Sequence, residues 1–157
     1  MILELKPMRL AGFYKEMSLI DNHTVTLWQS FIPHLRSLKH RVGQHLISLQ
    51  EYPPDYFESF QPGRSFKKWA LAEVSSIEES GEFEYITVHG MYAVFSYQGT
   101  PVDFSVAFQQ ILFEWLPNSG FQLDQRPHFE WLGKKYKRNE PTSEEEVWVP
   151  ITQANVT

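Results

Sequence analysis

Apolar side chains recur at helical spacing in residues 103–116. Six of them fall at positions i, i+3, i+4, i+7, i+8 and i+11, namely Phe104, Ala107, Phe108, Ile111, Leu112 and Trp115. This spacing gives a helix one apolar stripe. Thr100, Pro101 and Asp103 are residue types that favour a helix start, and Pro117–Gly120 are types that stop one. The pattern therefore predicts a helix over residues 103–116.

A second apolar stripe at helical spacing runs from residue 27 to residue 38. Its members are Leu27, Trp28, Phe31, Ile32, Leu35 and Leu38. Asp21, Asn22 and Thr24 precede the stripe and are suitable helix caps. Pro33 lies inside it, where proline removes a backbone hydrogen bond and collides with the preceding turn. The sequence therefore predicts a helix that is kinked or broken at Pro33.

Elsewhere short runs of β-branched and aromatic residues are typical of β-strands. These runs cover residues 45–50, 69–74, 84–97, 128–132 and 146–151. Glycine weakens a strand, so we expect Gly90 to divide the run 84–97. Residues 51–65 predict a loop, because they contain three prolines and a glycine. This loop also carries aromatic residues that either cap the core, the simpler interpretation, or cover a pocket: Tyr52, Tyr56, Phe57 and Phe60.

The predicted elements occur twice in the same order, strand–helix–strand–strand. Gly12-Phe13-Tyr14 opens the strand before the first helix, and Gly90-Met91-Tyr92 opens the strand before the second. Two such units side by side form an α+β domain with one largely antiparallel sheet and two helices. We therefore expect a single domain over residues 1–157, with pseudo-repeats at about 1–80 and 81–157. The junction of the repeats is the natural place for a ligand cleft.

Composition narrows the class of protein. Of the 157 residues, 42% are hydrophobic and 15% aromatic, which argues against disorder. Cysteine is absent, so disulfides and thiolate chemistry are excluded. The net charge of −5 argues against direct DNA binding, since a nucleic-acid surface needs a basic face. No apolar run reaches a membrane span, and no signal peptide is recognisable. We expect a soluble cytoplasmic protein without a membrane partner.

Most catalytic and cofactor motifs are missing. The glycines do not have a dinucleotide or P-loop spacing, no G-x-S-x-G or H-E-x-x-H motif occurs, and the histidines are not paired at helical spacing. The sequence thus predicts neither a cofactor nor a metal site. Glu130 is unusual because it lies within an aromatic strand, where alternation places His128, Glu130 and Leu132 on one face. Either Glu130 faces solvent and pairs with Arg126 or a lysine, or it is a single charge inside an aromatic pocket.

An ordered set of motifs resembles the GyrI-like effector-binding domain, the ligand-binding part of AraC-type and MerR-type multidrug regulators that also occurs alone. In the C-terminal half the motifs are Gly90-Met91-Tyr92-Ala93-Val94-Phe95, Trp115-Leu116-Pro117-Asn118-Ser119-Gly120-Phe121, Arg126-Pro127-His128-Phe129-Glu130 and Glu146-Val147-Trp148-Val149-Pro150-Ile151. In the N-terminal half they are Ala11-Gly12-Phe13-Tyr14 and Leu27-Trp28-Gln29-Ser30-Phe31. The resemblance therefore covers nearly the whole chain.

The resemblance implies a tandem-repeat fold and a groove that binds hydrophobic, often cationic compounds around a buried glutamate. Only Glu130 matches that glutamate, and Leu132 stands where relatives often carry a tyrosine. Aromatic walls and a carboxylate favour bulky cations, since a ligand cation relieves the cost of a buried charge. Candidate wall residues, each of which could instead be core, are Tyr14, Trp28, Phe31, Tyr92 and Trp148.

Three functions follow from this resemblance. The first is a stand-alone protein that senses or sequesters hydrophobic, cationic compounds and regulates transcription only through another protein, since we expect no helix-turn-helix. The second is a hydrolase of electrophilic natural products, in which Glu130 activates water and Tyr92 or Tyr14 polarises the leaving group. The third is a protein-partner role resembling gyrase inhibition. The sequence predicts no oligomeric state.

Overall fold

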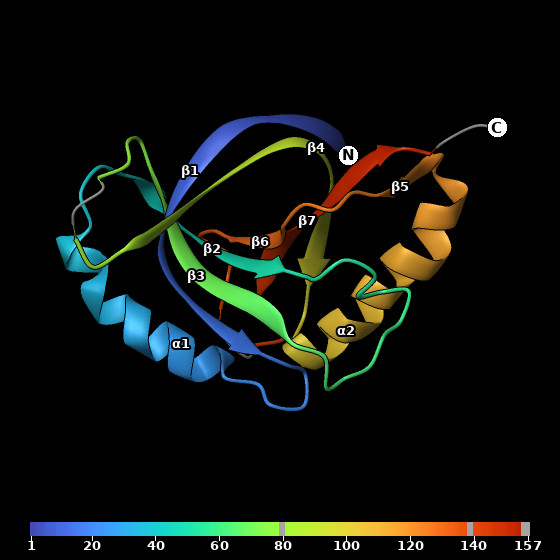
Figure 1. Ribbon diagram of the computed structural model, residues 1–157, viewed down its shortest axis with the longest axis horizontal. Coiled ribbons are helices and arrows are strands. Elements are labelled where there is room, and N and C mark those ends of the chain that lie inside the picture. Colours follow the sequence, from blue (N-terminus) through green and yellow to red (C-terminus); the bar gives the residue numbers. More distant parts are fainter. Residues whose placement is uncertain (79–80, 138–139, 155–157) are drawn as a thin grey trace.

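The sheet is antiparallel and closes on itself (Figure 1). The computed structural model describes residues 1–78, 81–137 and 140–154, without the side chains of residues 101–105. Strand β7 (Glu144–Gln153) pairs with β4 along one edge and with β6 and the short β5 (Phe121–Leu123) along the other. The closed ring runs in the order β4 (Glu84–Gln98), β1 (Ile2–Met17), β3 (Phe66–Val74), β2 (Arg41–Glu51), β6 (His128–Leu132) and β7.

Both helices pack on the same side of this sheet (Figure 1). Helix α1 spans Thr24–Phe31 and is followed by a 3-10 helix over Ile32–Ser37. Helix α2 spans Pro101–Gln110 and continues as a π-helical turn over Ile111–Trp115 and a 3-10 turn over Leu116–Asn118. The predicted α+β class with one antiparallel sheet and two helices is confirmed. None of the described helices is long and apolar enough to span a membrane.

Each half of the chain arranges its strands in the same way. In the first half β3 lies between β1 and β2, and in the second half β7 lies between β4 and β6. Strands β5 and β6 occupy the place that the longer β2 has in the first half, and they are separated by residues 124–127. Pairing of β2 with β6 and of β1 with β4 joins the two halves.

The helix predictions are confirmed in type and corrected at their ends. The α-helix of the first half changes to a 3-10 helix one residue before Pro33, as expected from the missing backbone donor. The second helix begins at Pro101, two residues earlier than the predicted range, and its last turns are π and 3-10 rather than α. Thr100 makes no side-chain capping bond, and the side chains of Asp103 and Phe104 lie outside the described part.

Two predictions about strands are wrong. Gly12 does not open β1, because that strand begins at Ile2. Glycine is needed at position 12 because a Cβ there would lie 1.9 Å from the Ala70 carbonyl oxygen. Gly90 does not divide β4, which is continuous from Glu84 to Gln98. Instead Gly90 has a φ of +102° opposite a register shift in β1, just before β4 starts to pair with β7. A glycine is therefore used at a bulge and not at a strand end.

Both faces of the sheet are buried. The inner face encloses a core that the closed ring surrounds, formed by Met8, Leu10, Ile47, Leu49, Trp69, Leu71, Val88, Tyr92, Val94, Phe129 and Trp148. The outer face is covered by the helices in two separate clusters. The α1 cluster includes Phe31, Phe66 and Ala70, and the α2 cluster includes Val147 and Val149. Strand β6 lies between the strands that carry these two clusters.

Candidate functional site

Glu130 lies on the helix-facing side of the sheet, between the α1 and α2 clusters. Its strand neighbour Phe129 points into the enclosed core, and strand alternation turns Glu130 to the opposite face. Ser48 of β2 and Val147 of β7 are its cross-strand partners. The side chain stays partly exposed. The predicted alternation along β6 therefore places this carboxylate where the two halves of the protein meet.

Three polar side chains surround Glu130, and we name the four together the carboxylate site: Glu130, Gln50, Lys68 and Glu145. The Gln50 amide donates a hydrogen bond of 3.1 Å to Glu130 Oε1. Burial raises the pKa of Glu130, while Lys68 and the Gln50 hydrogen bond oppose that rise. Within the described chain, Glu130 makes no ion pair with Arg126 or with a lysine. One form of the solvent-face interpretation is thereby excluded.

Glu145 is a second carboxylate close to Glu130. Cross-strand pairing sets Val147 opposite Glu130, and Glu145 is the next residue of β7 on the same face. Burial and the neighbouring Glu130 raise the pKa of Glu145 to about 7, against the opposing effect of Lys68. The charge of the site therefore changes near pH 7, where Glu145 gains or loses its proton.

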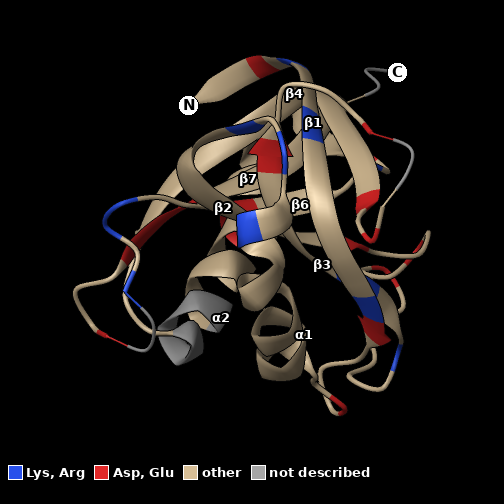
Figure 2. Ribbon diagram, turned by 90° about the vertical axis from the view of Figure 1, so that its left-hand side faces the viewer, with Lys and Arg blue, Asp and Glu red and all other residues tan. Residues whose placement is uncertain are grey.

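The charged residues that interact with Glu130 in the described part of the chain lie on strands of the sheet. Figure 2 shows no charged residue on α1 or on the described part of α2. Lys68 of β3 is the cation that acts on both carboxylates, and burial lowers its pKa while Glu130 and Glu145 oppose the decrease. Two acids and one lysine give the site a net negative charge when both acids are ionised.

Aromatic side chains from two segments pack beside Glu130. Tyr52 and Phe57 come from the turn after β2, and Phe108 comes from α2. All three contact His128, the residue two before Glu130 on the same face, with ring centroids 5.0, 5.5 and 6.0 Å apart. Burial raises the pKa of the Tyr52 hydroxyl well above its ordinary value, and the nearby Glu130 raises it further. The turn thus bridges the two halves directly at the carboxylate.

His128 is neutral in this position. It is 5% exposed, and its Nδ1 has no hydrogen-bond partner among the described residues. Burial, with a smaller effect of Arg126, lowers the pKa of His128 to about 3. The ring therefore adds an uncharged polar atom to an aromatic wall.

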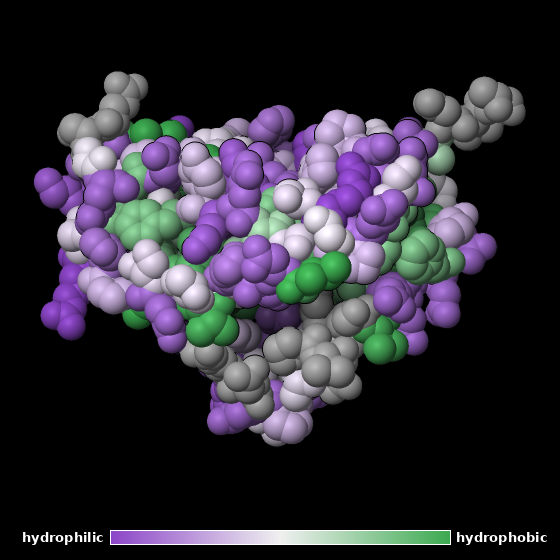
Figure 3. Space-filling view, turned by 60° about the horizontal axis from the view of Figure 1, so that its bottom comes forward, coloured by the Kyte–Doolittle hydropathy of each residue, from purple (hydrophilic) through white to green (hydrophobic). Residues whose placement is uncertain are grey.

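A cavity of about 460 Å³ lies under α2 and its π-helical turn. Its size is typical of small-molecule sites. Val147, the cross-strand partner of Glu130, and Tyr97, the partner of Glu145, belong to its lining. The other lining residues are Phe95, Ser96, Ala107, Phe108, Gln110, Ile111, Glu114 and Trp115. Figure 3 shows the helix-bearing face hollowed near its centre, with hydrophilic atoms at the bottom of the hollow.

The structure brings only part of the predicted wall to Glu130. Tyr92 and Trp148 lie in the enclosed core, on the opposite face of the sheet, where each packs against Phe129. Tyr14 packs against Trp69 on that same opposite face and is 43% exposed. Trp28 and Phe31 belong to the α1 cluster on the face of Glu130, where Phe31 is fully buried and Trp28 partly buried.

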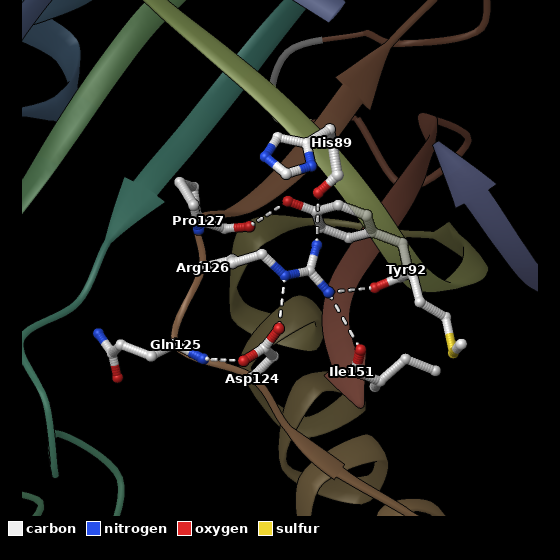
Figure 4. A network of polar contacts seen from close by, with 8 residues as sticks. His89, Tyr92, Asp124, Gln125, Arg126, Pro127 and Ile151 are labelled. Carbon is white, nitrogen blue, oxygen red and sulfur yellow. Dashed lines mark hydrogen bonds and ion pairs between the residues drawn. The ribbon is translucent and has the colours of Figure 1, made fainter. Parts of the chain in front are cut away.

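Arg126 fixes the start of β6 (Figure 4). Its guanidinium donates to the Asp124 carboxylate at 2.6 Å and to the backbone carbonyls of His89, Met91 and Ile151 at 2.6, 2.6 and 3.0 Å. It also lies 4.8 Å from the ring centroid of Tyr92, whose hydroxyl donates to the Pro127 carbonyl. These bonds tie β4, β7 and the β5–β6 connection together four residues before Glu130.

Comparison with known protein families matches almost the whole chain. The family model for the GyrI-like small molecule binding domain matches residues 1–152. Among curated proteins, no significant match to the sequence is found.

Several solved structures share this fold at low sequence identity. SAV2435 bound to tetraphenylphosphonium has a TM-score of 0.73 and 15% identity, over 97% of this chain and 93% of that one. The C-terminal domain of EcmrR has a TM-score of 0.68 and 12% identity, over 98% and 97%. A hydrolase encoded by lin2189 from Listeria innocua has a TM-score of 0.63 and 11% identity, over 97% and 91%.

Proposed function

This chain belongs to the family of GyrI-like small molecule binding domains, and we propose that its ligand is a lipophilic organic cation held at Glu130 between α1 and α2. The single observation that carries the proposal is a partly exposed carboxylate that has lost much of its hydration and is bordered by aromatic rings. Such a group is costly without a partner, so a cation that displaces the remaining water gains electrostatic free energy.

The surrounding side chains support a hydrophobic ligand body. Tyr52, Phe57 and Phe108 pack around His128, two residues before Glu130 on the same face of β6. Aromatic groups add cation–π attraction of about 0.5–2 kcal/mol when desolvated. The adjoining cavity of about 460 Å³ has room for bulky substituents. Trp28 on α1 stays a prediction for the wall of the ligand site on the α1 side of Glu130.

The ligand of a structural neighbour agrees with this class of compound. SAV2435 was solved with tetraphenylphosphonium, a bulky monocation with four aromatic rings. At 15% identity that likeness shows the fold alone, so for this chain the cation is supported by its own carboxylates and aromatic residues.

Tetraphenylphosphonium and tetraphenylborate test the proposal, because the two ions have nearly the same shape and opposite charge. Tryptophan fluorescence and calorimetry at fixed salt should show that the wild-type protein prefers the cation. Glu130→Gln should weaken cation binding about 30-fold, or by about 2 kcal/mol. One charge near 5 Å at an effective dielectric constant of 20 contributes about 3 kcal/mol, and desolvation offsets about 1 kcal/mol of it.

Glu4→Gln is the matched control. Glu4 is exposed on β1 and is separated from Glu130 by strands β4 and β7, so the same loss of charge there should leave binding within about twofold. Equal affinity of the wild-type protein for both ions, or equal losses in the two variants, would contradict a carboxylate-selected cation.

A further inference from the structure

Lys68 shares the helix-facing side of the sheet with the two carboxylates. It is the cross-strand partner of Gln50, which in turn pairs with His128 and donates its amide hydrogen bond to Glu130. One strand, β2, therefore separates the backbones of Lys68 and Glu130, a distance that a lysine side chain spans in part. The exposed Lys15, opposite Lys68 on β1, adds a like charge on the side away from the carboxylates.

The ammonium of Lys68 forms no hydrogen bond or ion pair within the described chain. Other basic side chains of this protein do form ion pairs with carboxylates. Lys135 contacts Glu144 at 3.4 Å, and Arg126 contacts Asp124 at 2.6 Å. Lys68 nevertheless interacts electrostatically with both Glu130 and Glu145. It is thus close enough to partly neutralise the site without a direct bond to either carboxylate in the described chain.

We propose that Lys68 is the specificity-determining residue of the carboxylate site and restricts it to lipophilic cations with a single positive charge. With both carboxylates ionised, Lys68 leaves a net charge of −1, which one monovalent cation neutralises. A dication would leave an excess positive charge beside the ammonium, in a region where burial strengthens repulsion. This proposal rests on the proposed binding of cations at Glu130.

Two probes differ in charge, and comparing variants on the same probe removes the effect of ligand size. The monocation is tetraphenylphosphonium, and the dication is p-xylylenebis(triphenylphosphonium), which carries the same triphenylphosphonium groups. Affinities are measured by calorimetry at fixed ionic strength and pH 8, above the pKa of Glu145. Lys68→Met removes the charge and keeps most of the stem, while Lys68→Arg keeps the charge. Lys67→Met is the matched control, because Lys67 points to the opposite face and lies over Tyr14.

Lys68→Met should raise the affinity for the monocation about tenfold and that for the dication by a larger factor, since the repulsion scales with ligand charge. Lys68→Arg should keep the wild-type preference, and Lys67→Met should leave both affinities within about twofold. Far-ultraviolet circular dichroism checks that each variant is folded.

The outcomes distinguish this proposal from the proposed function. If the wild-type protein prefers tetraphenylphosphonium to tetraphenylborate but Lys68→Met binds both phosphonium ions no more tightly, only the role of Lys68 is overturned. An unchanged ratio of dication to monocation affinity also overturns it. If the wild-type protein does not prefer the cation to the borate, both proposals fall.

Discussion

Replacing Arg126 with methionine tests how firmly β6, and with it Glu130, is held. The guanidinium donates to three backbone carbonyls that come from β4 and β7, and to the Asp124 carboxylate. Methionine keeps an unbranched apolar stem against Tyr92 but supplies no donor. The variant therefore removes the polar link between these strands and leaves most of the packing in place.

The expected loss of stability is about 3 kcal/mol. Hydrogen bonds that involve a charged group contribute about 1.5–3 kcal/mol each, and water reaching the exposed side of the cluster recovers part of that. The contact of Arg126 with the Tyr92 ring adds about 0.5–1 kcal/mol. For a domain of this size, such a loss lowers the melting temperature by about 6–12 °C. Urea unfolding followed by tryptophan fluorescence measures the difference directly.

Gly90→Ala is the second single variant of a double-mutant cycle with Arg126→Met. A Cβ at Gly90 would lie 2.7 Å from Arg126 Nη1, and the φ of +102° is strained for alanine in any background. Alanine thus costs both strain and a collision in the wild-type background, but strain alone in the double variant, where the guanidinium is gone. The double variant should be more stable than the sum of the single losses predicts by about 1 kcal/mol. Strict additivity, or an Arg126→Met variant within about 0.5 kcal/mol of the wild-type protein, would refute the argument.

Two further predictions concern the site. Cation affinity should decrease from pH 8 to pH 6, because Glu145 has a pKa of about 7 and loses its charge on protonation; Glu145→Gln should flatten this profile in calorimetry. The folded-state pKa of Glu145 is raised from 4.5, so the folded protein loses stability as pH rises through 7 and this carboxyl must ionise where it is partly buried. Glu145→Gln should therefore be more stable than the wild-type protein at pH 8 in urea unfolding. Phe57→Ala should weaken tetraphenylphosphonium binding several-fold, whereas Phe60→Ala, at a ring that is 50% exposed, should not.

Periodicity predicted the elements well where one physical cause dominates. The strand 128–132 has the predicted bounds, because its alternation is compact and it is flanked by Pro127 and Gly133. The helix of the first half changes type beside Pro33, where a backbone donor is missing. The prediction for Gly90 was wrong because a glycine in a strand is equally suited to an end and to a bulge, and only the pairing register of β1 with β4 shows which applies.

The candidate walls were harder to predict, since both faces of this sheet are buried. Alternation along a strand tells which residues share a face, but it does not tell which face carries the helices. Tyr92 and Trp148 match the aromatic pattern of a pocket and in fact fill the core enclosed by the ring. Tyr52 and Phe57 lie in the aromatic-rich loop for which a pocket cover was considered, and the signal was the excess of aromatic residues there.

Glu145 and Lys68 could not be assigned to the site from spacing, because they reach Glu130 only through the pairing register of three different strands. Their presence still has a physical implication. A partly buried lysine and a carboxylate that lack direct partners oppose folding, and apolar residues of similar volume would be more stable there. We infer that the free energy given up at the carboxylate site is recovered when a cationic ligand binds.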